Sequence, residues 1–194
     1  VSLHAMQFLG PPFTFGINVV SENITIVSPL AAINVEDTVF WMGRNEFYSY
    51  AGVVQRLPCT VRDYVFDDIN TFQLEKITAG TNTAFGEVWW FYPSASSQEN
   101  DRYVIYNYMQ QIWYYGNLSR TAWLDRGILD LPLAAHTDHY LYNHETGFDD
   151  GSTEPTSALA ANIESSQIDI GDGEQFIFMS RLIPDLTFVN SSAE

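Results

Sequence analysis

Residues 88 to 92 read Val-Trp-Trp-Phe-Tyr, so five consecutive positions carry apolar or aromatic side chains. Such a segment favours a β-strand, because β-branched and aromatic residues fit the pleated surface of a sheet. Successive side chains of a strand point to opposite faces, and a sheet with one wet face therefore alternates apolar and polar residues. The unbroken run predicts a strand that is covered on both faces.

The same pattern recurs along the chain. A polar loop follows the run at 88–92 and leads to the strand-like segment YVIYNY at 103–108, as expected of a β-hairpin. TVFWM at 38–42 is followed by the turn Gly-Arg-Asn-Glu and by EFYSY, and a weaker version, HYLYNHE, occupies 139–145. Helical periodicity is poor throughout, and DRYVIYNYMQQIWYY at 101–115 favours strands through its β-branched and tyrosine content.

The spacing of these segments indicates a repeat. TVFW begins at 38, VWWF at 88 and HYLY at 139, so the separations are 50 and 51 residues. Similar apolar strands precede them in PLAAINVED, KITAGTNTAFGE and LPLAAHTD. Four-stranded units at this period are typical of the blades of a β-propeller. The sequence thus predicts an all-β fold of antiparallel propeller blades with few or no helices, a partial propeller included, and a β-sandwich is the alternative.

The large side chains of these strands are the expected core. Packing between blades would bury them and would leave no free platform for a sugar or a nucleobase. The residues assigned to this structural core are Trp41, Trp89, Trp90, Phe91, Tyr103, Ile105, Trp113 and Trp123.

Charge limits the partners. The net charge is −16, from 24 acidic and eight basic residues, and such a chain repels nucleic acid. We expect most of the scarce arginines Arg102, Arg120, Arg126 and Arg181 to make bidentate contacts with carboxylates, in the subunit or across to a neighbour. No run approaches the ~18 apolar residues of a membrane-spanning helix, so we expect no membrane insertion. The one cysteine, Cys59, favours a buried inert thiol.

Candidate chemistry is sparse. His136, His139 and the pair His144-Glu145 offer metal ligands but flank a predicted hairpin, which disfavours convergence. The glycine-acid loops at 148–152 and 169–174 resemble calcium loops in composition but lack the EF-hand spacing. Carboxylates lie among Trp and Tyr residues, as a glycosidase would require. These carboxylates are Asp67, Asp68, Glu87, Asp125, Asp149 and Asp150.

None of these patterns exceeds chance in so acidic a chain, and no phosphate-binding loop or nucleophile elbow is present in the sequence. We expect no catalytic residue, no cofactor and no metal. Residues 147–160 have the composition of a long exposed loop, and residues 189–194 that of a frayed terminus.

Several motifs, in order, carry a family resemblance. They are FWMGRNEFYSYAG, LPCTVRDYVFDDIN, GEVWWFYPSASSQENDRYVIYNY, WYYGNLSRTAWLDRG, YLYNHETGFDDG and IDIGDGEQFIFMSRLIPD. Together they resemble the tail hub, or nozzle, proteins of short-tailed bacteriophages, also called packaged-DNA stabilisation proteins. The resemblance covers most of residues 8–188. Family members usually have substantial sequence before the part matching GPPFTFG, so we expect residues 1–194 to be a single propeller-like region of a longer tail subunit.

The resemblance implies a non-enzymatic virion protein, assembled in the cytoplasm of the host bacterium. Its copies would form a ring, hexameric in the family, below the portal and its adaptor proteins. That ring would close the DNA exit channel and carry tail fibres or spikes, with genomic DNA passing through without tight binding. A carbohydrate-binding or glycan-cleaving propeller and a cellular interaction scaffold are the alternatives.

Overall fold

The computed structural model describes residues 2–147, 149, 178, 180 and 181. The chain divides into two compact units, Val1–Gly147 and Phe148–Glu194, and every helix and strand below belongs to the first. The predictions for the loop at 147–160, the glycine-acid loops and the terminus at 189–194 concern residues of which the structure describes only Gly147 and Asp149.

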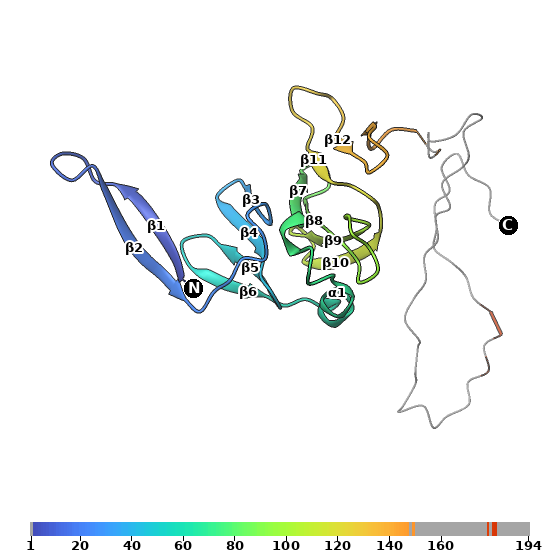
Figure 1. The fold of residues 1–194 in the computed structure, drawn as a ribbon, viewed down its shortest axis with the longest axis horizontal. Helices are drawn as coiled ribbons and strands as arrows, with labels where there is room; N and C mark the ends of the chain where they lie inside the picture. The colour runs from blue at the N-terminus through green and yellow to red at the C-terminus, as the bar shows by residue number, and fades with distance from the viewer. Residues whose placement is uncertain (1, 148, 150–177, 179, 182–194) are drawn as a thin grey trace. The chain divides into compact units, whose positions relative to one another are not determined.

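The first unit is built from four antiparallel sheets (Figure 1). A hairpin pairs β1 (Ser2–Phe8) with β2 (Phe15–Glu22). Sheet 1 contains β3 (Ala32–Val35), β4 (Thr38–Met42), β5 (Phe47–Tyr50) and β6 (Val54–Leu57). Sheet 2 contains β7 (Thr78–Asn82), β8 (Glu87–Tyr92), β9 (Arg102–Asn107) and β10 (Ile112–Asn117). Sheet 3 contains β11 (Ala122–Leu124), β12 (Leu133–Ala135) and β13 (Leu141–Asn143).

Sheets 1, 2 and 3 are simple meanders in which each strand pairs with the next along the chain. Between sheets 1 and 2 the chain forms α1 (Arg62–Asp68) and a 3-10 turn, η1 (Leu74–Lys76). Val65 of α1 is fully buried, and Phe66 packs on Phe47 with ring centroids 5.4 Å apart. The helix therefore closes the end of the core that these two sheets share.

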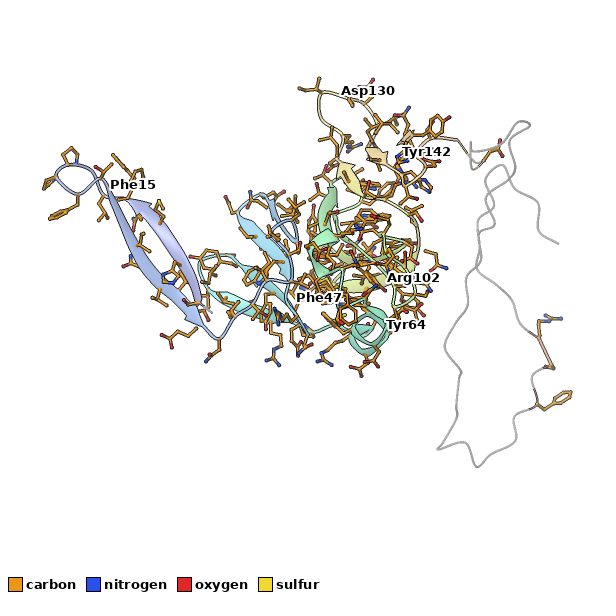
Figure 2. The ribbon with its side chains drawn as sticks, in the orientation of Figure 1. Phe15, Phe47, Tyr64, Arg102, Asp130 and Tyr142 are labelled. Carbon is orange, nitrogen blue, oxygen red and sulfur yellow. The ribbon has the colours of Figure 1, made fainter. Side chains whose placement is uncertain are left out.

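The core lies between sheets 1 and 2. Phe47, which Figure 2 labels, packs against Trp90 at 4.9 Å and Trp113 at 4.7 Å between ring centroids. Phe40 of the same sheet contacts Tyr106 at 6.0 Å. These side chains belong to one buried cluster, which fixes sheet 1 on one face of sheet 2.

The opposite face of sheet 2 is covered by sheet 3. Trp123 of β11 stacks on Trp89 at 5.1 Å and contacts Phe91 at 5.6 Å. Along β8, Trp89 and Phe91 thus face sheet 3, and Trp90 faces sheet 1. The prediction that the run at 88–92 is covered on both faces is confirmed.

The all-β class is also confirmed, but the predicted repeat is wrong in detail. The first strands of the three sheets begin at 32, 78 and 122, so the separations are 46 and 44 residues. HYLYNHE contributes only β13, the third strand of its sheet, because β11 precedes the strand that we expected to come first. Sheet 3 has three strands in the described part of the chain, and residues 2–147 do not close a ring of sheets.

Candidate functional site

Seven of the eight predicted core residues lie at the two contacts between sheets. Trp41 instead lies on the face of sheet 1 turned away from sheet 2, where it stacks on Tyr48 at 5.4 Å between ring centroids. Trp41, Trp90, Phe91, Ile105 and Trp113 are buried, whereas Trp89, Tyr103 and Trp123 are half-buried. We call the contact between sheets 1 and 2 the first seam, and the contact between sheets 2 and 3 the second seam. Of the seven residues at the seams, all except Ile105 contact another aromatic ring of sheets 1 to 3.

Indole hydrogen bonds join neighbouring sheets. Trp90 donates its Nε1–H to the carbonyl of Ala31 at 3.0 Å, and Trp123 donates to the carbonyl of Thr81 at 2.7 Å. Each bond runs from a tryptophan of one sheet to the backbone at the first strand of the preceding sheet. Because a buried indole needs an acceptor, these bonds fix the angle at which the sheets stack.

The second seam depends on a glycine. Gly80 lies in β7 opposite Trp89, and a Cβ built there would lie 2.5 Å from Cδ1 of Trp123. Any larger residue would displace the indole. Asp125 also crosses this seam, since its Oδ2 accepts from the Thr81 hydroxyl and the Thr83 amide, both at 2.9 Å.

A cleft of about 490 Å³ opens beside the second seam. Its walls carry the aromatic rings of Trp89, Tyr103 and Tyr114. Two carboxylates, Glu87 and Glu145, also line it. We call this feature the acidic cleft.

The two carboxylates are held by different partners. Glu87 Oε2 accepts the indole N–H of Trp89 at 3.0 Å, and Glu145 Oε1 accepts the amide of Asn82 at 3.0 Å. Asn82 pairs with Glu87 in the β7–β8 register, which brings all four side chains to one end of sheet 2. Burial, and secondarily the charge of Glu145, raise the pKa of Glu87, whereas the bond from Trp89 lowers it.

A carboxylate with a raised pKa beside a second carboxylate and aromatic rings can bind hydroxyl groups or transfer a proton. Glu87 was one of the carboxylates singled out in the sequence, but Glu145 was considered only as a metal ligand beside His144. The other carboxylates do not join them: Asp67 and Asp68 lie on α1, and Asp125 is used by the second seam.

The histidines do not converge on a metal. His136 Nδ1 accepts the backbone N–H of Asp138 at 3.0 Å, His139 is exposed in the turn, and His144 Nε2 accepts from Arg120 Nε at 2.9 Å. Burial, with the charge of Arg120, lowers the pKa of His144 to about 4. Within the described part of the chain, no three His, Cys, Asp or Glu side chains are grouped as metal ligands.

The expected arginine pairs are wrong within the subunit. Arg102 makes a single contact, 3.2 Å from Nε to Asp68 Oδ2, and its NH1 donates to Asn117. Arg120 instead bonds His144 and the carbonyl of Ser119, and its guanidinium lies 5.0 Å from the centre of the Tyr142 ring.

Aromatic and neutral partners replace the carboxylate at Arg120 because burial among rings favours cation–π contact. Burial also lowers the pKa of Arg120. Arg126 and Arg181 form no ion pair with any residue that the structure describes. Among the described residues of the subunit, none of the four arginines makes a bidentate contact with a carboxylate, and contacts with a neighbouring copy stay a prediction.

Residues 2–147 form an all-β arrangement of stacked antiparallel meanders with two aromatic seams and an acidic cleft. No protein-family model and no curated protein matches its sequence. Within the described residues, no helix has the length and apolar character needed to cross a membrane.

Proposed function

We propose that the chain is a structural subunit of a bacteriophage tail, whose copies form a ring below the portal and adaptor proteins. The ring closes the DNA exit channel and carries fibres or spikes. The observation that carries the proposal is that the motifs resembling tail hub proteins coincide with the seams. FWMGRNEFYSYAG forms β4 and β5, GEVWWFYPSASSQENDRYVIYNY forms β8 and β9, and WYYGNLSRTAWLDRG forms β10 and β11.

The seams suit a mechanical role. Large aromatic side chains fill both faces of sheet 2, and indole bonds tie each sheet to the one before it. A chain of sheets joined in this way can continue as further blades, which supports a propeller as the complete arrangement. Rigid packing of this kind resists deformation, as a closure against packaged DNA requires.

The charges support a channel that does not adhere to DNA. Tight binding of phosphates requires exposed arrays of lysine and arginine, which release counterions. Here Lys76 contacts Glu99, and Arg56 and Arg62 both contact Glu46. These cations are paired with carboxylates of the same chain and offer little attraction to phosphates. The ring would therefore retain the DNA by blocking its path and not by binding it.

The loop at 94–101 is one candidate for a constriction. Asp101 accepts from both the amide and the hydroxyl of Ser94 at 2.7 Å, and the buried Asn100 donates to the carbonyl of Lys76 at 2.8 Å. The loop is therefore fixed by its own polar side chains. The second candidate, at 147–160, lies essentially outside the described residues.

Two measurements on the purified chain test the proposal. Negative-stain electron microscopy is expected to show rings with a central channel. Fluorescence anisotropy is expected to show no binding of a duplex oligonucleotide at physiological salt. Particles without a ring, across a range of concentrations at which the chain self-associates, would contradict the tail assignment, and micromolar affinity for duplex DNA would contradict the non-adhesive channel.

The acidic cleft favours a second candidate, a saccharide-binding or glycan-cleaving protein. Aromatic rings beside carboxylates suit sugar hydroxyls and the apolar faces of sugar rings, and the raised pKa of Glu87 suits a proton donor. A glycan array and a hydrolysis assay test it. Glu87→Gln is expected to abolish binding or cleavage, with Glu99→Gln, which does not line the acidic cleft, as the matched control.

A further inference from the structure

The β1–β2 hairpin has one exposed face that is apolar apart from His4. In its register Met6 lies opposite Ile17 and Phe8 opposite Phe15, and these cross-strand pairs place their side chains on the same face. Val19 and the turn residue Phe13 extend the patch, whereas Leu9 packs over Gly16 on the opposite face. The six residues of the patch, Met6, Phe8, Phe13, Phe15, Ile17 and Val19, are between 56% and 72% exposed. We call them the hairpin patch.

The opposite face differs in chemistry. Ala5 pairs with Asn18, and Gln7 pairs with Gly16. The hairpin is therefore amphipathic, although a two-stranded ribbon with one apolar face is marginal when it stands in water. In Figure 2 the side chains around Phe15 come from the hairpin itself. Phe15 contacts only Phe8 among aromatic rings, at 5.7 Å between centroids.

The size of the patch exceeds what an ordinary monomer leaves exposed. Three phenylalanines and three aliphatic side chains, each more than half exposed, present roughly 600–700 Å² of apolar surface. The largest apolar patch of a typical monomer is about 300–600 Å², and one partner of a standard interface buries about 800 Å². The hairpin patch thus matches one side of a protein interface.

We propose that a second copy of this chain covers the hairpin patch. The argument for a copy comes from charge. Residues 1–21 contain no Asp, Glu, Lys or Arg and are the longest such run in a chain of net charge −16. Copies of so acidic a chain repel one another, so they associate only through a surface that adds no further charge and is driven by apolar burial.

A basic partner would be recognised differently. Acidic residues are abundant elsewhere in the chain, and a contact with such a partner would use them for attraction and orientation. The hairpin patch offers no carboxylate to a basic surface. The face is therefore suited to a like-charged molecule, and a second copy is like-charged by definition.

A contact between copies through the hairpin patch would be one of the interfaces of the proposed ring, and this part of the inference rests on the proposed function. The self-association can nevertheless be measured alone. Sedimentation velocity between about 1 and 100 µM, a range that brackets ordinary subunit affinities, is expected to show species of two or more copies. Association should strengthen between about 50 and 300 mM salt, because screening weakens the repulsion between copies.

Ile17→Asp is the decisive variant, since it puts a charge in the centre of the hairpin patch. It is expected to weaken association roughly tenfold or more. Gln7→Asp is the matched control: it adds the same charge to an exposed position of the same hairpin, on the opposite face. The control is expected to associate like the parent chain. Near-ultraviolet circular dichroism of the tryptophan seams verifies that both variants keep their fold.

A second measurement identifies the occupant. A photo-crosslinking residue in place of Phe13, in an equal mixture of ¹⁴N- and ¹⁵N-labelled chains, is expected to give mixed ¹⁴N–¹⁵N products. Crosslinks confined to one copy would overturn the proposal, as would a chain that stays monomeric at the highest concentration. Equal effects of Ile17→Asp and Gln7→Asp would overturn it too. A monomer that floats with phosphatidylcholine vesicles would assign the patch to lipid instead. Self-association through the patch without rings would refute the tail assignment alone.

Discussion

Replacing Trp90 tests whether the first seam holds the two larger sheets together. The Trp90 side chain is fully buried, contacts the rings of Phe47 and Trp113, and donates to the carbonyl of Ala31. Trp90→Ala removes the whole indole and leaves a cavity, because the surrounding rings belong to strands of two sheets and cannot close it. Large aromatic-to-alanine changes in cores cost about 3–5 kcal/mol.

The hydrogen bond and the packing can be separated with Trp90→Phe. This change keeps a ring in the site but leaves the Ala31 carbonyl without its donor, at an expected cost of about 1–2 kcal/mol. The difference between the two variants, about 2–3 kcal/mol, is then the contribution of the remaining ring to packing. Trp89→Ala in the half-buried partner position is the control, and it should cost less than Trp90→Ala because part of its surface already meets water.

Urea denaturation monitored by near-ultraviolet circular dichroism measures these free energies of unfolding. A domain of this size has a stability of about 5–15 kcal/mol, so Trp90→Ala can remove much of it, and Trp90→Phe then keeps the test readable. A cost below about 1 kcal/mol for Trp90→Ala would refute the reasoning, because no buried seam residue of this size is removed so cheaply. A change in the slope of the free energy of unfolding against urea concentration would show instead that the sheets no longer unfold together.

Three further predictions concern other groups. Gly80→Val is expected to destabilise by about 1–3 kcal/mol, because its side chain must displace Trp123, whereas Gly127→Ala, with open space around its Cβ, should change the midpoint of urea denaturation little. The pKa of His144 falls from 6.5 to about 4 on folding, because the folded state favours the neutral imidazole. The contribution of neutral His144 to the free energy of unfolding is therefore complete above pH 6.5 and is lost as the pH falls through 4. Discounted for partial exposure, the loss is about 1–2 kcal/mol, and a His144→Gln variant that kept the same pH dependence of unfolding would contradict it. Burial raises the pKa of Cys59 from 9.0 to about 11, so a thiol reagent at pH 8 should react with it about a hundredfold more slowly than with a free thiol. A reaction in the folded chain as fast as that of a free thiol would show that the Cys59 thiol is not buried.

The strands of sheets 1 and 2 could be predicted from the sequence because each is long and rich in aromatic residues. TVFWM coincides with β4, and the segment at 101–115 divides into parts of β9 and β10 as its tyrosines suggested. Sheet 3 could not be placed in the same way. Its strands have three residues each, too few for periodicity to be seen, and β11 is defined by where Trp123 packs rather than by its composition.

The acidic cleft shows a different limit. Glu87 and Glu145 are far apart in sequence, and they line one cleft because Asn82 links the end of β7 to the segment after β13. No local pattern encodes that link. The hairpin patch, by contrast, had a local signal in the alternation of His4, Met6 and Phe8 and of Phe15, Ile17 and Val19, within a run without charge. Gly10, Pro11 and Pro12 of the turn interrupt that signal between the two strands.

The aromatic residues of this chain therefore serve two different surfaces. In the seams, a tryptophan can be covered and still give its indole hydrogen to a backbone carbonyl, as Trp90 and Trp123 do. In the hairpin patch the aromatic residues are phenylalanines only, and their side chains carry no hydrogen-bonding group. A side chain without a polar atom gains nothing from water or from a specific acceptor, so burial is the one stabilisation open to it. That contrast is the physical ground for assigning the seams to the fold and the hairpin patch to association.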